Sequence, residues 1–264
     1  MYEMKWTKAI GVAFRSLVYF LLLAPLVVVI CTAFSETNRV VFPGRGFTLQ
    51  WFERAFTNAE FTKSLLLSVQ IACVSVFLAC VLGTMISLWF WKSNSRAKSL
   101  FQMIFLSPIV IPTIISAVAF LQYFALFRGV FTDYWKLCLT YAVIELPYVI
   151  RTVTANLAGL DTSFEEASVV LGASPFKTLF QVTLPCIRQG IIGGAIFSFV
   201  VAFDECVIIM FMKSAKTVTF PLRLYSYITE SFTPLISAYS TLFIIAAAAV
   251  LYLVERKIGV SRLY

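Results

Sequence analysis

The chain has 264 residues, of which 60% are hydrophobic and only 13% are charged. Because soluble domains carry about 25% charged residues, this composition excludes an ordinary soluble domain and predicts an integral membrane protein. The formal net charge is +8, but the basic residues are scattered singly near the ends of apolar segments. Membrane topology and contact with anionic lipid account for this charge better than binding to nucleic acid does.

The first 60 residues predict one membrane helix followed by a loop on the outer side. A basic stretch at 1–15 precedes an apolar run at 16–34. The run is about 19 residues long, which exceeds the apolar core of most signal peptides, and no A-x-A cleavage site follows it. We therefore expect an uncleaved first span. In the loop, apolar residues at helical spacing over 49–56 predict a short helix, either at the membrane interface or packed on the bundle.

Five further spans are expected at 64–91, 100–127, 137–157, 190–212 and 238–254. The third of the six spans contains Pro108 and Pro112, and proline within a span frees backbone carbonyls that need other partners. The fifth begins with glycines and an alanine, small residues that allow close contact between helices. The fold class predicted is therefore an all-α membrane protein with about six transmembrane helices.

The distribution of charge predicts how the chain is oriented. Three basic residues fall in each of the four segments expected on the cytoplasmic side, which together hold 12 of the 21 Lys and Arg residues. This excess follows the positive-inside rule. It places both termini in the cytoplasm, together with the polar segment 161–185 that joins the fourth and fifth spans.

The polar segment reads as two short helices joined at a glycine. Ser163 is a suitable N-cap, and Glu166 three residues later can close a capping box. Gly172 suits the left-handed residue that ends a helix. Ser174 and Pro175 then provide an N-cap and a first helical position. We expect the second helix to end at Pro185.

Part of this segment resembles a known motif. Glu-Ala-Ser, three residues, glycine, nine residues and Val-Thr-Leu-Pro match the EAA loop of ABC importer permeases, which reads Glu-Ala-Ala, three residues, glycine, nine residues and Ile-x-Leu-Pro. Ser168 replaces the second alanine and Val182 replaces isoleucine. The resemblance covers roughly residues 60–255. It implies a type I importer permease fold, most like the spermidine/putrescine subfamily.

This resemblance divides the chain into three parts. It implies an N-terminal helix and periplasmic loop at 1–60, a permease core at 61–255 and a cytoplasmic tail at 256–264. Within the core, residues 158–188 form a cytoplasmic coupling loop that docks on a separate ATPase. The residues expected to contact the ATPase are Glu165, Glu166, Ala167, Ser168, Gly172, Ala173, Ser174, Pro175, Leu184 and Pro185.

The resemblance also implies partners in the bacterial inner membrane. They are a dimer of ABC ATPases, a second and related permease subunit, and a periplasmic substrate-binding protein. The chain contains no G-x-x-x-x-G-K-[ST] phosphate-binding loop, so ATP and Mg belong to the ATPase and no cofactor is expected in this subunit. It also lacks histidine and a G-x-S-x-G motif, so an intramembrane enzyme is poorly supported.

Three acidic residues, Glu145, Asp204 and Glu205, lie within expected spans. A carboxylate at the bilayer centre costs about 2.5–3.5 kcal/mol on insertion scales, so such residues face a protein interior or a wet cavity. One interpretation is an electronegative translocation pathway for a small organic cation. The run at 199–205 resembles a Ser-Phe-Asp-Asp segment of polyamine permeases. The alternative is structural, with an acid paired to a base such as Arg151.

Other functions are compatible with parts of this sequence. The transported solute of an ABC importer of this kind can also be an amino acid, an opine, an aminophosphonate or a sugar. A self-sufficient cation-coupled transporter would use the three acids for coupling. That class commonly has inverted repeats, which are not evident here, and it leaves the EAA-like segment without a purpose.

Overall fold

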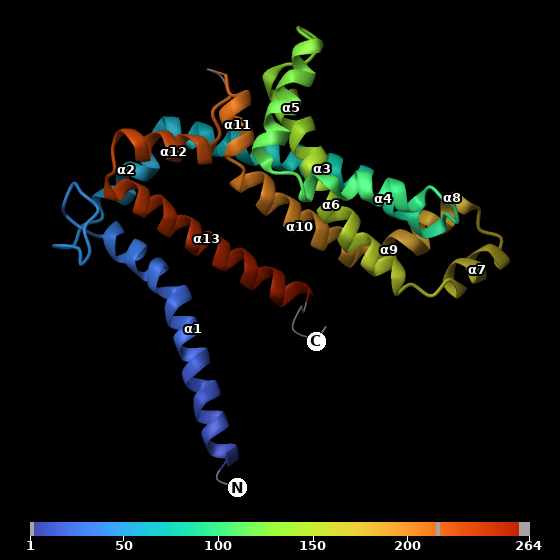
Figure 1. Ribbon diagram of the computed structural model, residues 1–264, viewed down its shortest axis with the longest axis horizontal. Helices are drawn as coiled ribbons and strands as arrows, with labels where there is room; N and C mark the ends of the chain where they lie inside the picture. Colours follow the sequence, from blue (N-terminus) through green and yellow to red (C-terminus); the bar gives the residue numbers. More distant parts are fainter. Residues whose placement is uncertain (1–2, 215–216, 259–264) are drawn as a thin grey trace. The chain divides into compact units, whose positions relative to one another are not determined.

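The computed structural model describes residues 3–214 and 217–258, and all the regular structure in these residues is helical (Figure 1). The helices are α1 (Glu3–Ala33), α2 (Gln50–Thr57), α3 (Ala59–Lys92), α4 (Lys98–Leu106), the 3-10 helix η1 (Ser107–Ile109), α5 (Thr113–Leu126), α6 (Asp133–Ala158), α7 (Ser163–Val170), α8 (Pro175–Thr178), the π-helix η2 (Leu179–Thr183), α9 (Leu184–Cys186), α10 (Arg188–Asp204), α11 (Val207–Met212), α12 (Phe220–Glu230) and α13 (Pro234–Ile258).

The chain forms two compact units. One consists of Met1–Thr62 with Leu224–Tyr264, and the other is Lys63–Arg223. The division expected from sequence, at 1–60, 61–255 and 256–264, stays a prediction, and residues 259–264 of the expected tail lie outside the described residues.

In the first unit, α13 packs against α1 and α2. The hydroxyl of Thr32 donates to the Ser237 hydroxyl at 3.0 Å, and the Tyr239 hydroxyl donates to the carbonyl of Ala55 at 2.9 Å. The short helix expected over 49–56 is α2. Its Trp51 is buried and donates its indole N–H to a loop carbonyl, so the packed alternative describes this helix.

In the second unit, α10 lies along α6, and glycine makes the close approach possible (Figure 1). A Cβ atom on Gly190 would lie 2.8 Å from the side chain of Asn156, and one on Gly194 would lie 2.6 Å from the hydroxyl oxygen of Thr152. Gly193, by contrast, has nothing within 4 Å of that position. The small residues at the start of α10 therefore allow close packing, but only two of the three glycines face α6.

Three helical segments of the described chain are long and apolar enough to cross a membrane: Ile10–Ala33, Ala59–Lys92 and Asp133–Ala158. The number rises to five if each of two bent pairs counts as one span. The apolar part of α13, Pro234–Val250, is shorter. The structure thus has the several apolar helices of a multi-span protein, and a sixth crossing by α13 stays an expectation.

Two expected spans differ from continuous helices. The segment expected at 100–127 is broken into α4–η1 and α5, which meet at 103°. Pro108 lies at the start of η1 and Pro112 directly precedes α5, where a missing N–H and a fixed φ fit helix starts. The segment expected at 190–212 is α10 followed by a break and α11. The segment between the fifth and sixth expected spans, 213–237, contains α12, a helix that was not predicted from the sequence.

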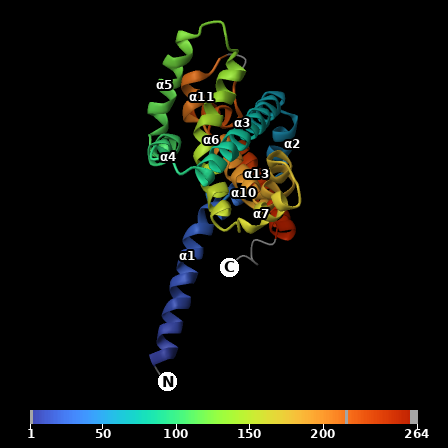
Figure 2. The same ribbon diagram turned by 90° about the vertical axis from the view of Figure 1, so that its right-hand side faces the viewer.

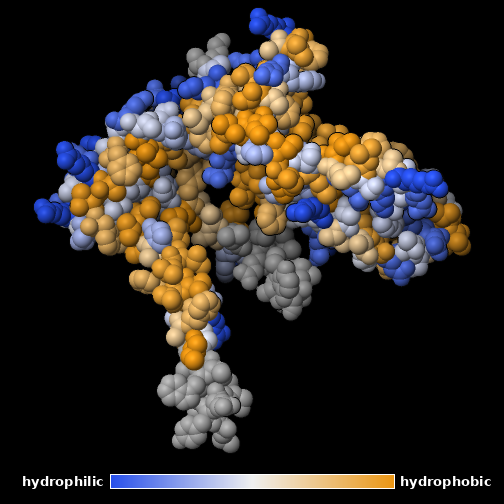
Figure 3. Space-filling model, in the orientation of Figure 1, coloured by the Kyte–Doolittle hydropathy of each residue, from blue (hydrophilic) through white to orange (hydrophobic). Residues whose placement is uncertain are grey.

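Much of the surface is apolar, as expected for helices that face lipid. Large side chains of α1 such as Phe14, Phe20 and Leu22 are more than 60% exposed. Figure 3 shows the hydrophobic colour over α1 and hydrophilic residues over the end that carries α7. Apolar exposure on this scale marks a surface that another apolar phase covers.

Candidate functional site

The coupling loop begins with a turn closed by Asp161. Its carboxylate accepts a 2.9 Å hydrogen bond from the backbone N–H of Ser163, and this bonding lowers the pKa of the Asp161 carboxyl. Ser163 is the first residue of α7, and the N-cap position belongs to Thr162, whose side chain makes no capping hydrogen bond, so the expected Ser163–Glu166 capping box is wrong. An aspartate two residues earlier forms the competing turn and places negative charge at the helix N-terminus.

The turn between α7 and α8 confirms the predicted glycine. Gly172 has φ of +84°. Its N–H bonds to the carbonyl of Val169 at 2.9 Å, and the N–H of Ala173 bonds to that of Ser168 at 3.1 Å, the two bonds of a Schellman motif. A Cβ atom here would meet nothing within 4 Å. The backbone angle, and not a lack of space, therefore requires glycine.

The start of α8 is also as predicted. The Ser174 hydroxyl accepts a 3.4 Å hydrogen bond from the N–H of Lys177, and Pro175 occupies the first helical turn. The hydroxyl groups of Ser168 and Thr178 lie 3.0 Å apart and link α7 to α8. The two short helices are thus joined by a backbone turn and by a side-chain hydrogen bond.

Pro185 does not end the second helix. The helix widens into the π-helical η2, in which the N–H of Leu184 bonds to the carbonyl of Leu179, and it continues through Pro185 in α9. Proline in an α-helix clashes with the carbonyl four residues earlier, here that of Gln181, and a π turn relieves that constraint. The direction changes at Ile187, where the helices before and after it meet at 65°.

Glu165 ties the coupling loop to the end of α3. One carboxylate oxygen lies 3.1 Å from the ammonium of Lys92, and the other accepts a hydrogen bond from the hydroxyl of Thr183 in η2. The Glu165 side chain is 16% exposed. Of the residues expected to touch an ATPase, this one therefore points into its own subunit. Nothing in the sequence pattern predicted the pair with Lys92.

The other expected contact residues divide by exposure. Those on the surface are Glu166, Ala167, Gly172, Ser174, Pro175 and Pro185, and those partly buried are Ser168, Ala173 and Leu184. The most exposed apolar side chains of the loop were not predicted: Val170 and Leu171 are 85% and 87% exposed, and Phe176 is 73% exposed. In the sequence, the signal for this exposed surface was an apolar run, Val169–Leu171, within an otherwise polar segment.

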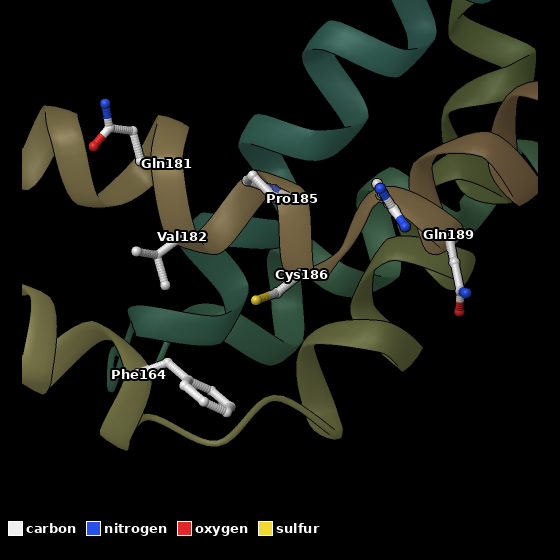
Figure 4. Close-up of a pocket in the computed structure, with 7 residues that line it drawn as sticks. Phe164, Gln181, Val182, Pro185, Cys186 and Gln189 are labelled. Atoms are coloured by element: carbon white, nitrogen blue, oxygen red, sulfur yellow. The ribbon is translucent and has the colours of Figure 1, made fainter.

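A hollow of about 500 Å³ opens on the coupling loop. Figure 4 shows Phe164 of α7 on one side and Val182 and Cys186 on the other. Gln181, Pro185, Arg188 and Gln189 complete its lining. The hollow and the exposed apolar residues of the turn give the loop both concave and convex surfaces.

Glu145 is fully buried within the second unit. The hydroxyl of Ser75 in α3 donates a 2.9 Å hydrogen bond to one carboxylate oxygen, and the second oxygen has no hydrogen-bond partner among the described residues. Arg151 is exposed and forms no described ion pair with it. This chain alone thus gives Glu145 no open surface, in contrast to the pathway position expected from sequence.

Asp204 and Glu205 lie at a break and not on one helix. α10 ends at Asp204, and Glu205 is extended, with φ −68° and ψ 112°. The Glu205 carboxylate accepts a 3.0 Å hydrogen bond from the N–H of Ile208 in the first turn of α11, and Tyr141 of α6 donates its hydroxyl to the Glu205 carbonyl at 3.2 Å. The fifth expected span, 190–212, is therefore not one continuous helix at these two acids. Glu205 acts as a cap, while Asp204 is exposed.

Residues 75–259 match the family described as the binding-protein-dependent transport system inner membrane component. The chain belongs to this family. It is 28% identical to the spermidine/putrescine transport system permease protein PotC of Haemophilus influenzae over 241 residues, which cover 91% of this chain and 93% of that protein. It is 27% identical to the putrescine transport system permease protein PotI of Escherichia coli, with coverage of 87% and 83%.

Solved structures show the same fold. A bacterial ABC transporter that imports alginate has a TM-score of 0.70 at 11% identity, covering 97% of this chain and 96% of that one. The MetNI methionine ABC transporter has a TM-score of 0.59 at 17% identity, covering 75% and 94%. The chain is therefore a multi-pass permease subunit of an ABC importer. The family works with an ATPase that hydrolyses ATP and with a substrate-binding protein, and this subunit is not itself an enzyme.

Proposed function

We propose that this permease forms the translocation pathway for a small organic cation, with a polyamine such as putrescine or spermidine as the substrate. The observation that carries the proposal is the exposed carboxylate of Asp204 at the end of α10, inside an expected span. The relatives named for spermidine and putrescine support it.

The position of Asp204 has an electrostatic consequence. The last carbonyl groups of a helix have no helical partner, and the helix dipole places partial negative charge there. A carboxylate at this point is unfavourable until a cation compensates it. Broken membrane helices bind cations in this way in other transporters, through carbonyls at the ends of half-helices. An ammonium group of a polyamine is a cation of this kind, and it is also a hydrogen-bond donor.

The other two acids have supporting roles in this proposal. Glu205 fixes the start of α11 through the N–H of Ile208, and so sets where the break occurs. Glu145 holds α6 to α3 through Ser75. Both act on the backbone or on neighbouring helices, whereas Asp204 faces the substrate.

The coupling loop transmits motion in this proposal. Exposed residues of the turn, Val170 and Leu171 with Phe176 of α8, dock on the ATPase together with the exposed motif residues. Glu165 then passes the displacement to α3 through Lys92 and to η2 through Thr183. A second, non-identical permease completes the pathway, and both termini lie in the cytoplasm.

Uptake by the assembled importer in proteoliposomes tests the substrate. Labelled putrescine should accumulate in the vesicles only when the ATPase faces the lumen and ATP is enclosed there. Unlabelled spermidine should compete with it. Asp204→Asn should lower the uptake rate while the amount of copurified ATPase is unchanged. Competition by a neutral sugar or an aminophosphonate, with no effect of polyamines, would reject the cation pathway.

A further inference from the structure

A second hollow lies at the opposite end of α6 from the coupling loop, among α5, α6 and α11. Its volume is about 340 Å³. Figures 1 and 2 both show α5 and α11 side by side, and these helices pack against each other. Among the lining residues, Arg128 and Lys213 are exposed and so mark the mouth, whereas Phe124 and Met212 are buried and lie deeper.

The mouth of the cavity carries excess positive charge. Arg128, Lys136 and Lys213 line it, with Asp133 as the acid. Asp133 is already paired with Lys136, whose ammonium lies 2.9 Å from its carboxylate. No acidic group in the described part of the chain lies within ion-pair distance of Arg128 or Lys213. Two uncompensated cations therefore face one small volume and favour an anion there.

The inner wall is apolar. Leu121 and Phe124 of α5 and Phe211 and Met212 of α11 line it. Phe124 and Met212 are buried, whereas Leu121 and Phe211 are 44% and 39% exposed, so the apolar wall extends from the interior to the surface. A free inorganic anion would gain nothing from this wall, while a molecule with an anionic head and an apolar chain would contact both parts. A polyamine would be repelled at the mouth, so the cavity is separate from the proposed pathway.

The surroundings of the cavity are those expected at the depth of lipid headgroups. Tyr123, Phe127 and Trp135 near its mouth are 40–52% exposed, and exposed aromatic residues of this kind collect at the membrane interface. Figure 3 shows hydrophilic residues at the tip of the α5–α6 connection, above a hydrophobic surface.

We propose that this cavity binds the phosphate-bearing headgroup of an anionic phospholipid, with Arg128 and Lys213 on the phosphate and an acyl chain along α5 and α11. On the cytoplasmic side of other membrane proteins, basic pockets between helices bind anionic headgroups, and the same ionic contacts are available here. The bound lipid would hold the short α11 against α5, just beyond the break at Glu205. Only the choice of leaflet, the outer one, rests on the proposed function.

Native mass spectrometry of the assembled importer, equilibrated with equal amounts of phosphatidylglycerol and phosphatidylcholine, tests this site. The wild-type complex should retain phosphatidylglycerol in preference. Since each basic side chain near an anionic membrane surface contributes about a factor of five, Arg128→Gln/Lys213→Gln should lower this preference about 25-fold. Arg39→Gln/Arg45→Gln, which removes two cations from an exposed loop of the other unit, should leave the preference within about twofold.

Two further arms keep the result decisive. If the double variant does not assemble, each single variant should lower the preference about fivefold, and Arg128→Lys should preserve it. Unchanged lipid preference in these variants would overturn the proposal. So would complete displacement of the lipid by inorganic phosphate, which indicates a free-anion site, or loss of the periplasmic binding protein with lipid retention intact, which indicates a protein contact. Polyamine uptake in the same preparations separates failure of this site from failure of the pathway.

Discussion

In the coupling loop, backbone groups of the turn bond to one another, whereas the α10–α11 break depends on side chains, one of them from another helix. Gly172 closes a Schellman turn without help from any other helix. Glu205, in contrast, depends on its own carboxylate for one bond and on Tyr141 of α6 for another. A self-contained turn can move as a unit when pushed. A break held by long-range contacts can change with helix packing, which suits a pathway that opens and closes.

The largest effect should come from Gly172→Val, which breaks the self-contained turn. A side chain at φ of +84° costs about 1–2 kcal/mol, and more for a β-branched residue. We expect the ATPase that copurifies per permease to fall about tenfold or more. Gly172→Asn is the matched control because asparagine tolerates this conformation, and it should retain most of the ATPase. Equal retention by the two variants would show that the turn does not hold the docking surface.

Helix packing behind the break should respond next. Gly194→Val places a side chain against Thr152 and Val149 of α6 and should lower stability by about 1–3 kcal/mol through overpacking. Gly193→Val, one residue earlier, has open space and shares the same helix propensity. Thermal unfolding of the two variants in detergent compares them directly. Similar midpoints would contradict the close approach of α10 to α6.

The smallest effect should come from the link between the loop and α3. Lys92 is 57% exposed, so its pair with Glu165 is screened and contributes about 0.2–1 kcal/mol. Lys92→Met or Glu165→Gln should lower solute imported per ATP hydrolysed about two- to threefold. The swap Lys92→Glu/Glu165→Lys should recover part of the loss. If each single variant imports as much solute per ATP as the swapped variant does, the Lys92–Glu165 pair does not carry the motion.

The features that could be predicted from sequence are the local ones, and the features that could not are those held by tertiary contacts. Gly172, Ser174 and Pro175 act within one or two turns of chain, so local rules predicted their roles correctly. Asp161 also acts locally. Its carboxylate accepts from the N–H of Ser163 and forms a turn where the Ser163 cap was expected. Residue type alone marked the segment as a connector between spans, and the family resemblance then supplied its partner.

Tertiary contacts decide the features that sequence reasoning missed. The break at Glu205 is held by Tyr141, which is 64 residues away in the chain, and no periodicity signals it. Burial of Glu145 depends on the approach of α3, since Ser75 supplies its hydrogen bond. A hydropathy profile does not distinguish the three acids, because each is a charged residue within an apolar segment. The fold gives them different surroundings and therefore different roles.

Uptake of putrescine by Asp204→Asn and Glu205→Gln importers, measured side by side, tests the central claim most directly. Each change removes one negative charge and keeps the side-chain volume, and the glutamine oxygen can still accept from the N–H of Ile208. The account predicts about a tenfold or greater loss of initial rate for Asp204→Asn, equivalent to about 1.4 kcal/mol, and at least half of the wild-type rate for Glu205→Gln. Equal rates for the two variants, or a loss confined to Glu205→Gln, would contradict it.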